Sequence, residues 1–453
     1  MLKYSLHNIL ALRFATAMFV FILALSAAAW AQGSRPASRT ATQPAPESTS
    51  SKPADTTKEE ELLAIVGGDV ETVTMGRLRG ATILIKGSKI WKVGRNIDIP
   101  EKAKRIDARG YWVYPGLVAP RASNITAGGF GAGGKLGDRY DPFSLSVLGT
   151  IAGGITTIYQ SDTIIKLSTK SVEDLVLKDN ACVRFTYNTA QNRYETRERF
   201  ERARNYLFEL REFEARKAAN DKDAKEPKKD GVDETTLRLL KREIPARFEI
   251  DRASEMMPIL ELLDEYRFDC VFSGCLEAWT IPNELSRRGV KCILSPRRRE
   301  QRDERRETLT GSSIEASAIL AKAGVEFSFY PPPGFDGGDI ITWGGIAGRD
   351  LQTFAMEGAW AIRGGLDEHR ALEAITISPA RIMGVEHRIG SIEPGKDADI
   401  IITDGPIFDF RTYTQTAIVN GVVQYEKSKV SLFKDIRPPQ KPPTEVPAYP
   451  VEK

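Results

Sequence analysis

Residues 371–405 read ALEAITISPARIMGVEHRIGSIEPGKDADIIITDG, and this stretch carries the strongest fold signal in the chain. It predicts a helix over Asp367–Ile377 that ends before Ser378-Pro379, because proline is well tolerated in the first turn of a following helix. The Gly and Pro residues of IEPGKDAD predict tight turns between short strands. The stretch therefore indicates a change from helices to a small β structure, and we interpret its residues as structural.

Short β-rich runs also lie towards the other end of the chain, over Leu62–Val113. Within them, ATILIKGSKIWKVG is typical of a hairpin whose turn is Gly87-Ser88. Beyond residue 405, TAIVNGVVQYEK again predicts strands joined by a tight turn. Strand-rich segments therefore flank a central region on both sides.

The central region alternates apolar β runs with helical stretches, which predicts an α/β protein built from βα units around a parallel sheet. Two of the runs, ITTIYQ and IIKL, are too close together to hold a crossover helix, so the strand count is open. Eight runs nevertheless suit a (β/α)₈ barrel. They are WVYPGLV, ITTIYQ, IIKL, ACVRFTY, ARFEI, DCVFSG, KCILSP and VEFSFYP.

A charged insertion is expected at residues 195–243. Phe200, Ala203, Leu207 and Leu210 recur at helical spacing, which predicts an amphipathic helix with a polar loop after it. We interpret its many charges as a solvated face.

The first 31 residues have the features of a signal peptide. Lys3 and Arg13 are basic, the apolar run spans Ala15–Ala31, and Ala29-Trp30-Ala31 is a small-residue cleavage pattern. The run is shorter than the ~20 residues of a bilayer span, which favours cleavage over an uncleaved anchor. We therefore expect a secreted or periplasmic protein with no stable membrane span after cleavage.

Two further segments read as extensions of the folded part. Residues 32–60 are rich in Ser, Thr, Pro and Ala and predict a disordered linker. Residues 430–453 contain RPPQKPPTEVPAYP and predict an extended Pro-rich tail.

Two stretches together resemble the amidohydrolase superfamily, close to its imidazolonepropionase-like branch: GYWVYPGLV at Gly110–Val118, and Ala371–Gly405 followed by IVNGVVQYE. The resemblance implies a (β/α)₈ TIM-type barrel at 115–388 and a small composite β-sandwich at 61–114 and 389–429. It also implies a metal-dependent hydrolase of carbon–nitrogen bonds other than peptide bonds, with zinc or another divalent ion.

The residues that would bind this metal are missing. The chain has three His, and His7 would leave with the signal peptide, so only His369 and His387 remain, both in the C-terminal region. At the strand-end positions where the resemblance implies catalytic or metal-binding residues, we find Ala119, Arg121, Ser123, Glu249 and Gly274. Arginine donates hydrogen bonds only and stays cationic, so it cannot ligate Zn²⁺. We therefore predict no metal cofactor, and the loss of metal-dependent catalysis.

A barrel without its metal keeps a pocket at the carboxyl ends of its strands. Arg121 and Ser123, together with a basic run at Arg297, Arg298 and Arg299, predict a site for a small anionic ligand such as a carboxylate or sulfate. The alternative for the basic run is a salt-bridged helix surface. On this interpretation the protein is a pseudoenzyme that binds a ligand.

Two other functions are open. Glu249, Asp251 and Asp162 are weak candidates for the paired carboxylates of a metal-free hydrolase. An interaction or scaffold protein is the third reading, with the linker, the insertion and the tail as attachments. The net charge of +3 is nearly balanced, which argues against a nucleic-acid partner. A homo-oligomer is left open, as is a disulfide between Cys270 and Cys292.

Overall fold

The structure is a computed structural model in which residues 61–122, 125, 135–171, 173–300, 311–331 and 353–436 are described. By its internal contacts the chain divides into Met1–Lys58 and Glu59–Lys453, and every described residue belongs to the second unit. The predicted signal peptide and linker, Ser123, and the tail beyond residue 436 lie outside the described residues. Among the residues that are described, no helix combines the length and apolarity needed to cross a bilayer.

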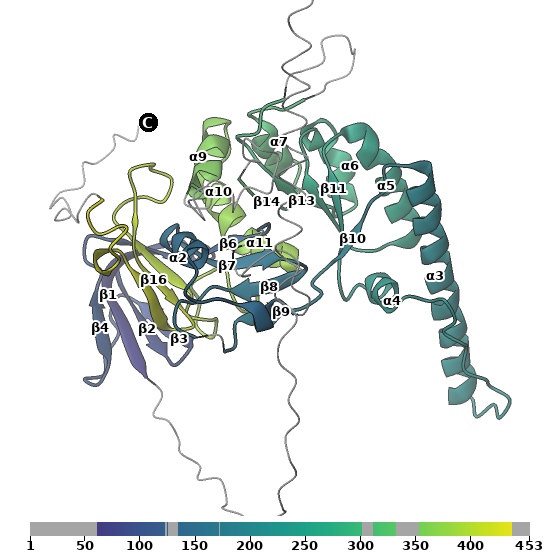
Figure 1. Cartoon of the computed structure of the whole chain (residues 1–453), viewed down its shortest axis with the longest axis horizontal. Coiled ribbons are helices and arrows are strands. Elements are labelled where there is room, and N and C mark those ends of the chain that lie inside the picture. Colours follow the sequence, from purple (N-terminus) through teal and green to yellow (C-terminus); the bar gives the residue numbers. More distant parts are fainter. Residues whose placement is uncertain are drawn as a thin grey trace, which may run out of the picture. The chain divides into compact units, whose positions relative to one another are not determined.

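Strands from both ends of the described chain build one eight-stranded sheet (Figure 1). Its path is β17-β16-β15-β5-β1-β2-β3, and β4 pairs with β1. The two chain ends meet where β5 runs antiparallel to β15, with Val113 opposite Ile402. The strand bounds are β1 Leu62–Glu71, β2 Arg77–Lys86, β3 Lys89–Gly94, β4 Lys104–Asp107, β5 Trp112–Pro115, β15 Ile400–Thr403, β16 Thr414–Val419 and β17 Val422–Glu426.

Two tight turns hold this sheet in register. The predicted hairpin is confirmed, since Lys86 pairs with Lys89 across the turn Gly87-Ser88. The second turn is Asn420-Gly421, between β16 and β17, with φ of 50° and 74°. Positive φ at both central residues is the requirement of the type I′ hairpin turn, which Asn-Gly meets at low cost.

The central strands form two further sheets. The five-stranded sheet has the order β10-β11-β12-β13-β14, and all four of its pairings are parallel. In the four-stranded sheet, β6 is parallel to β7, and β8 and β9 follow antiparallel. The bounds are β6 Leu117–Ala119, β7 Ile155–Gln160, β8 Thr163–Lys166, β9 Val176–Lys178, β10 Val183–Phe185, β11 Ala246–Ile250, β12 Cys270–Gly274, β13 Lys291–Leu294 and β14 Phe327–Phe329.

The closely spaced runs ITTIYQ and IIKL form a hairpin, because the three residues between them cannot hold a crossover helix. Ser161 and Asp162 have φ of 51° and 62°, the values of a type I′ turn. This resolves the open strand count: β8 returns alongside β7 and is not a separate βα unit.

Helices cover the parallel strands on the outside (Figure 1). Phe200 of α3 packs edge-to-face against Phe185, Tyr266 and Phe268, which ties this helix to β10 and to the end of α5. The helix bounds are α2 Leu145–Ala152, α3 Ala190–Ala218, α4 Glu234–Leu240, α5 Ala253–Tyr266, α6 Pro282–Arg287, α7 Ala316–Lys322, α9 Ala355–Arg363, α10 Glu368–Ile375 and α11 Ile377–Met383; three short 3₁₀ turns are η1 Gly137–Arg139, η2 Ala278–Thr280 and η3 Lys427–Lys429.

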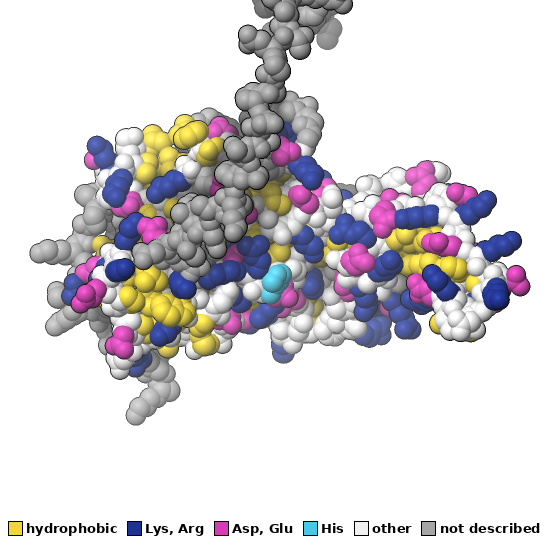
Figure 2. Space-filling model, turned by 90° about the horizontal axis from the view of Figure 1, so that it is seen from below, with side chains coloured by type: hydrophobic (Ala, Val, Ile, Leu, Met, Phe, Trp, Pro, Cys, Tyr) yellow, Lys and Arg dark blue, Asp and Glu magenta, His cyan; other side chains and the backbone are white. Residues whose placement is uncertain are grey.

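The charged insertion begins earlier than expected. Helix α3 starts at Ala190, five residues before the predicted boundary, because Thr189 caps it by accepting a hydrogen bond from the Asn192 amide. Phe200 and Ala203 are fully buried, as their spacing predicts. On the face shown in Figure 2, basic and acidic side chains are interspersed.

The start of the Pro-rich tail also differs from the expectation. An extended arm was expected from residue 430, but Phe433 packs edge-to-face against Tyr425 of β17, with ring centroids 6.1 Å apart. Phe433 thus packs against the composite sheet, because it has apolar surface to bury.

Candidate functional site

An open cleft of ≈640 Å³ lies at the carboxyl ends of β11 and β12. Five of the predicted site positions line it: Arg121, Glu249, Asp251, Gly274 and Arg298. The charged groups in its wall are three arginines and four carboxylates, namely Arg121, Arg252, Arg298, Glu249, Asp251, Glu255 and Glu300. Both signs of charge therefore line the cleft, and its wall is not a purely basic surface.

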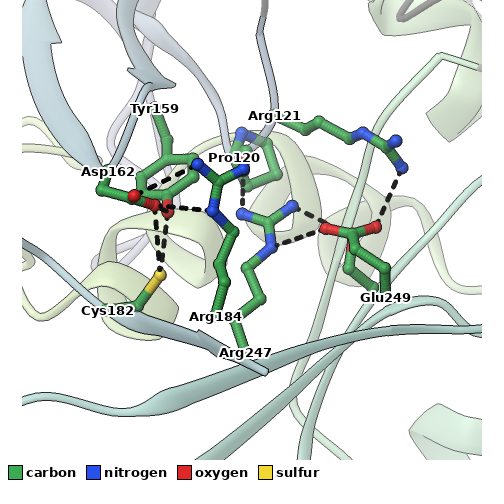
Figure 3. A network of polar contacts seen from close by, with 9 residues as sticks. Pro120, Arg121, Tyr159, Asp162, Cys182, Arg184, Arg247 and Glu249 are labelled. Carbon is green, nitrogen blue, oxygen red and sulfur yellow. Dashed lines mark hydrogen bonds and ion pairs between the residues drawn. The ribbon is translucent and has the colours of Figure 1, made fainter. Parts of the chain in front are cut away.

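Arg247 is the most constrained charge at this site (Figure 3). Its side chain is only 5% exposed. The guanidinium donates to Glu249 Oε1 (3.1 Å), to the carbonyl oxygen of Pro120 (3.0 Å) and to the hydroxyl of Ser273 (3.0 Å). It also lies over the ring of Tyr159, 4.9 Å from the centroid. Arg247 thereby connects β11 to β12, to β7 and to the residue that follows β6.

Glu249 carries two guanidinium partners on one carboxylate. Arg247 binds Oε1, and Arg121 lies 3.3 Å from Oε2 (Figure 3). Burial opposes ionisation, but the charges of Arg247 and Arg121 and the hydrogen bonds from Ser273 and Arg247 outweigh it and lower the pKa of Glu249. The carboxyl therefore stays ionised at neutral pH and is a poor source of a proton.

Asp251 and Arg298 form a second ion pair in the cleft, with 2.7 Å between Arg298 Nη1 and Asp251 Oδ1. The neighbouring Tyr330 is buried, and Arg121 lies over its ring, 4.9 Å from the centroid. Burial raises the pKa of Tyr330 although Arg121 and Arg298 lower it, so this phenol remains neutral. Arg121 and Arg298 thus converge on one aromatic side chain.

The third candidate carboxylate, Asp162, lies in a separate cluster (Figure 3). Arg184 binds both of its oxygens, at 3.0 and 3.1 Å, and the Tyr159 hydroxyl donates to it at 2.5 Å. The same hydroxyl lies 2.8 Å from Cys182 Sγ. Arg247, stacked on Tyr159, is the link between this cluster and Glu249. Asp162 is therefore not paired directly with either of the other two candidates.

The three arginines of the basic run, Arg297–Arg299, contact different parts of the protein. This corrects their interpretation as one ligand-binding group. Arg298 lines the cleft. Arg297 binds the fully buried Glu357 of α9, and Arg299 lies over Trp360 of the same helix. The reason is that Glu357, which has no exposure to solvent, requires a cationic partner.

The implied metal positions do not fit a metal ion. Arg121 is a cation, and Glu249 already binds two guanidinium groups. Gly274 has φ of +105°, and a Cβ there would lie 2.5 Å from Asp251 Oδ1, so no ligating side chain can be placed at this position without displacing Asp251. Within the described part of the chain, no group of three or more His, Cys, Asp and Glu is arranged to hold a metal.

Sequence reasoning missed Arg247 and Tyr159. The available signal was the alternation of side chains along a strand, which places Arg247 and Glu249 on the same face of ARFEI. A buried arginine two residues before a candidate carboxylate requires that carboxylate as its partner. No signal in the sequence indicated that Tyr159 lies under the same guanidinium.

The chain matches a family model described as the amidohydrolase family over residues 282–430. It is 31% identical over 110 residues to the amidohydrolase tasK of Hapsidospora irregularis, a match that covers 23% of this chain and spans only 11% of the length of that protein. An amidohydrolase structure from Thermotoga maritima MSB8 is 25% identical and aligns over 80% of this chain and 100% of that one, with a TM-score of 0.60. These matches confirm the predicted fold class, a barrel with a composite β-sandwich, and residues 282–430 are similar to the amidohydrolase family.

Proposed function

We propose that this protein is an exported amidohydrolase-fold ligand-binding protein that has lost metal-dependent hydrolysis, derived from the imidazolonepropionase-like branch. The observation that carries the proposal is the pairing of Glu249 with both Arg247 and Arg121 at an implied metal position. Hydrolysis in this superfamily relies on a metal-activated water, and two guanidinium groups repel a divalent cation at that place. The cleft itself persists and is large enough for a small ligand.

The ligand that fits this cleft carries a carboxylate or a similar anionic group. Arg121 and Arg298 offer planar donor groups that match a carboxylate in bidentate geometry. In the ligand-free protein they pair with Glu249 and Asp251. A bound anion must therefore displace a protein carboxylate, so binding is expected to depend on the strength of these two ion pairs.

The alternative of a metal-free carboxylate hydrolase gains no support from the geometry. Such a mechanism needs one carboxyl that is protonated at neutral pH. The pKa of Glu249 is lowered, and Asp162 lies in another cluster. In the cleft, Asp251 is paired with Arg298, and Glu249 is paired with Arg247 and Arg121.

Two measurements test the loss of hydrolysis. Elemental analysis of the purified protein is expected to find clearly substoichiometric zinc, iron and manganese. Assays with lactam, amide and ester substrates, with and without added metal, are expected to show no turnover. A stoichiometric metal ion, or hydrolysis that a chelator abolishes, would overturn the proposal.

Ligand binding is tested by thermal shift with a panel of mono- and dicarboxylates, sulfate and phosphate. Asp251→Asn releases Arg298 and is expected to strengthen binding of the anions that bind, whereas Arg298→Ala weakens it. Arg299→Ala is the matched control, because Arg299 lies over Trp360. If no anion shifts the melting temperature of either the wild type or Asp251→Asn, the anion site is wrong.

A further inference from the structure

The guanidinium of Arg247 lies where three strand ends of the barrel meet. Its three hydrogen bonds go to β11 through Glu249, to β12 through Ser273, and to the carbonyl of Pro120, directly after β6. These are the carboxyl ends of the strands, where a barrel of this class holds its reactive groups. One side chain therefore joins elements that are up to 153 positions apart in sequence, from Pro120 to Ser273.

From this geometry we propose that Arg247 is an internal substitute for a bound cation: its guanidinium, supported by Arg121, supplies the positive charge that holds the strand ends together. The inference concerns how the barrel is held, and it stands whether or not the cleft binds an anion.

The partners of Arg247 are suited to a cation. A carboxylate, a main-chain carbonyl and a hydroxyl all present oxygen lone pairs, and the planar guanidinium satisfies all three at 3.0–3.1 Å. Its face is covered by Tyr159, an arrangement favoured by the cation–π interaction. The side chain is only 5% exposed, so these contacts are made away from bulk solvent.

The same arrangement excludes a second cation. A metal at Glu249 would have to displace Arg247 from Oε1 or Arg121 from Oε2, and it would then lie close to two fixed positive charges. Arg247 thus supplies the positive charge at this place, and both carboxylate oxygens of Glu249 already interact with guanidinium nitrogens.

Chemical rescue of the full-length protein tests the inference. Arg247→Ala removes the guanidinium and leaves a space of the same shape among the three oxygens. We expect this variant to melt at a clearly lower temperature than the wild type, and millimolar methylguanidinium to restore part of the loss. The wild type is expected not to respond, and methylammonium, which is not planar, is expected to rescue less.

Arg288→Ala is the matched control for rescue. Arg288 also binds two carboxylates, Asp264 and Glu284, but both of these lie at the surface with 56% and 38% exposure. These carboxylates remain open to water after its removal, so methylguanidinium is expected to have little effect. Equal rescue of Arg288→Ala and Arg247→Ala, or no rescue of Arg247→Ala, would show that Arg247 does not act as an internal cation.

A second pair of variants serves if Arg247→Ala does not fold. Arg247→Lys keeps the charge and Arg247→Met removes it, at similar chain length. The lysine variant is expected to be the more stable of the two, and equal melting temperatures would refute the role of charge. The two proposals can fail separately. If no anion binds in the screen described above but Arg247→Lys is still more stable than Arg247→Met, the proposed ligand binding is wrong and the inference about Arg247 stands.

Discussion

The ammonium nitrogen of Lys166 lies 2.7 Å from Asp397 Oδ2, and the two side chains are 0% and 1% exposed. Lys166 ends β8, in the sheet that continues from β7, whereas Asp397 precedes β15 of the composite sheet. Asp399 is a second carboxylate at 2.7 Å, and the Asn420 side-chain oxygen accepts at 2.6 Å. A buried ion cluster therefore joins the barrel strands to the sandwich.

Replacing Lys166 with Met is expected to destabilise the protein by about 3–5 kcal/mol, because the buried Asp399 loses its cationic partner, whereas Asp397 keeps Lys89 and Arg388. Urea unfolding measures the change. Lys322→Met, at an exposed position of α7, is the control and is expected to change the free energy of unfolding by less than ~0.5 kcal/mol. A loss in Lys166→Met no larger than in the control would mean that the cluster contributes no net stability.

Glu357 is expected to make the free energy of unfolding depend on pH, and mutation of this residue isolates its contribution. Burial raises its pKa from 4.5 to about 7 although Arg297 favours the ionised form. The folded protein therefore holds this proton more tightly than the unfolded chain, so raising the pH through the window from about 4.5 to about 7 lowers stability. We expect a decrease of roughly 3 kcal/mol in the wild type that is absent from Glu357→Gln.

The measurement is the free energy of unfolding at several pH values across that window, taken as the difference between wild type and variant. Glu261→Gln, at an exposed position of α5, provides the reference for a solvated carboxyl. A difference between the wild type and Glu357→Gln that is flat with pH would contradict the raised pKa.

The four cysteines are expected to resist alkylation in the native protein. All are free thiols, and Cys270, Cys275 and Cys292 are buried. Burial raises the pKa of Cys182, which lowers its thiolate population. Iodoacetamide at pH 8, followed by mass spectrometry, should leave the native chain unlabelled over a period in which the denatured chain takes four labels. Fewer than four labels after denaturation would indicate a disulfide.

Gly421 and Gly80 form a matched pair for backbone strain. Both have positive φ, at +74° and +61°, so an alanine at either position costs ~1 kcal/mol. A Cβ at 421 would also lie 2.1 Å from the Gly87 carbonyl oxygen, whereas a Cβ at 80 meets nothing within 4 Å. Gly421→Ala is therefore expected to be ~1–3 kcal/mol less stable than Gly80→Ala in urea unfolding. Equal stability of the two variants would show that the turns at Gly87-Ser88 and Asn420-Gly421 can separate at no cost in free energy.

Much of the fold could be predicted from the sequence because turns and helices depend on residues that are close together in the chain. The Asn-Gly turn at 420–421 and the spacing of Phe200 and Ala203 each depend on neighbours in sequence. The short spacing of ITTIYQ and IIKL excluded a parallel crossover between them but left the strand count open, and the hairpin at Ser161-Asp162 comes from the structure. Such features survive any change in the chemistry at the strand ends.

The site was only partly readable because its contacts are not local. Arg121, Glu249 and Arg298 were predicted from their places at strand ends, and they do line one cleft. Their pairings depend on how distant strands approach: Arg297 and Arg298 are adjacent in sequence, yet one binds Glu357 and the other Asp251. Composition alone gave no means to assign these partners.

The place of Arg247 in the barrel has one more consequence. An ion held by coordination exchanges with solution, and its occupancy follows the supply in the medium. A guanidinium attached to β11 has a fixed occupancy of one in every folded molecule. Chelators, or a habitat poor in transition metals, therefore leave the charge of Arg247 unchanged. This charge is encoded in the polypeptide itself.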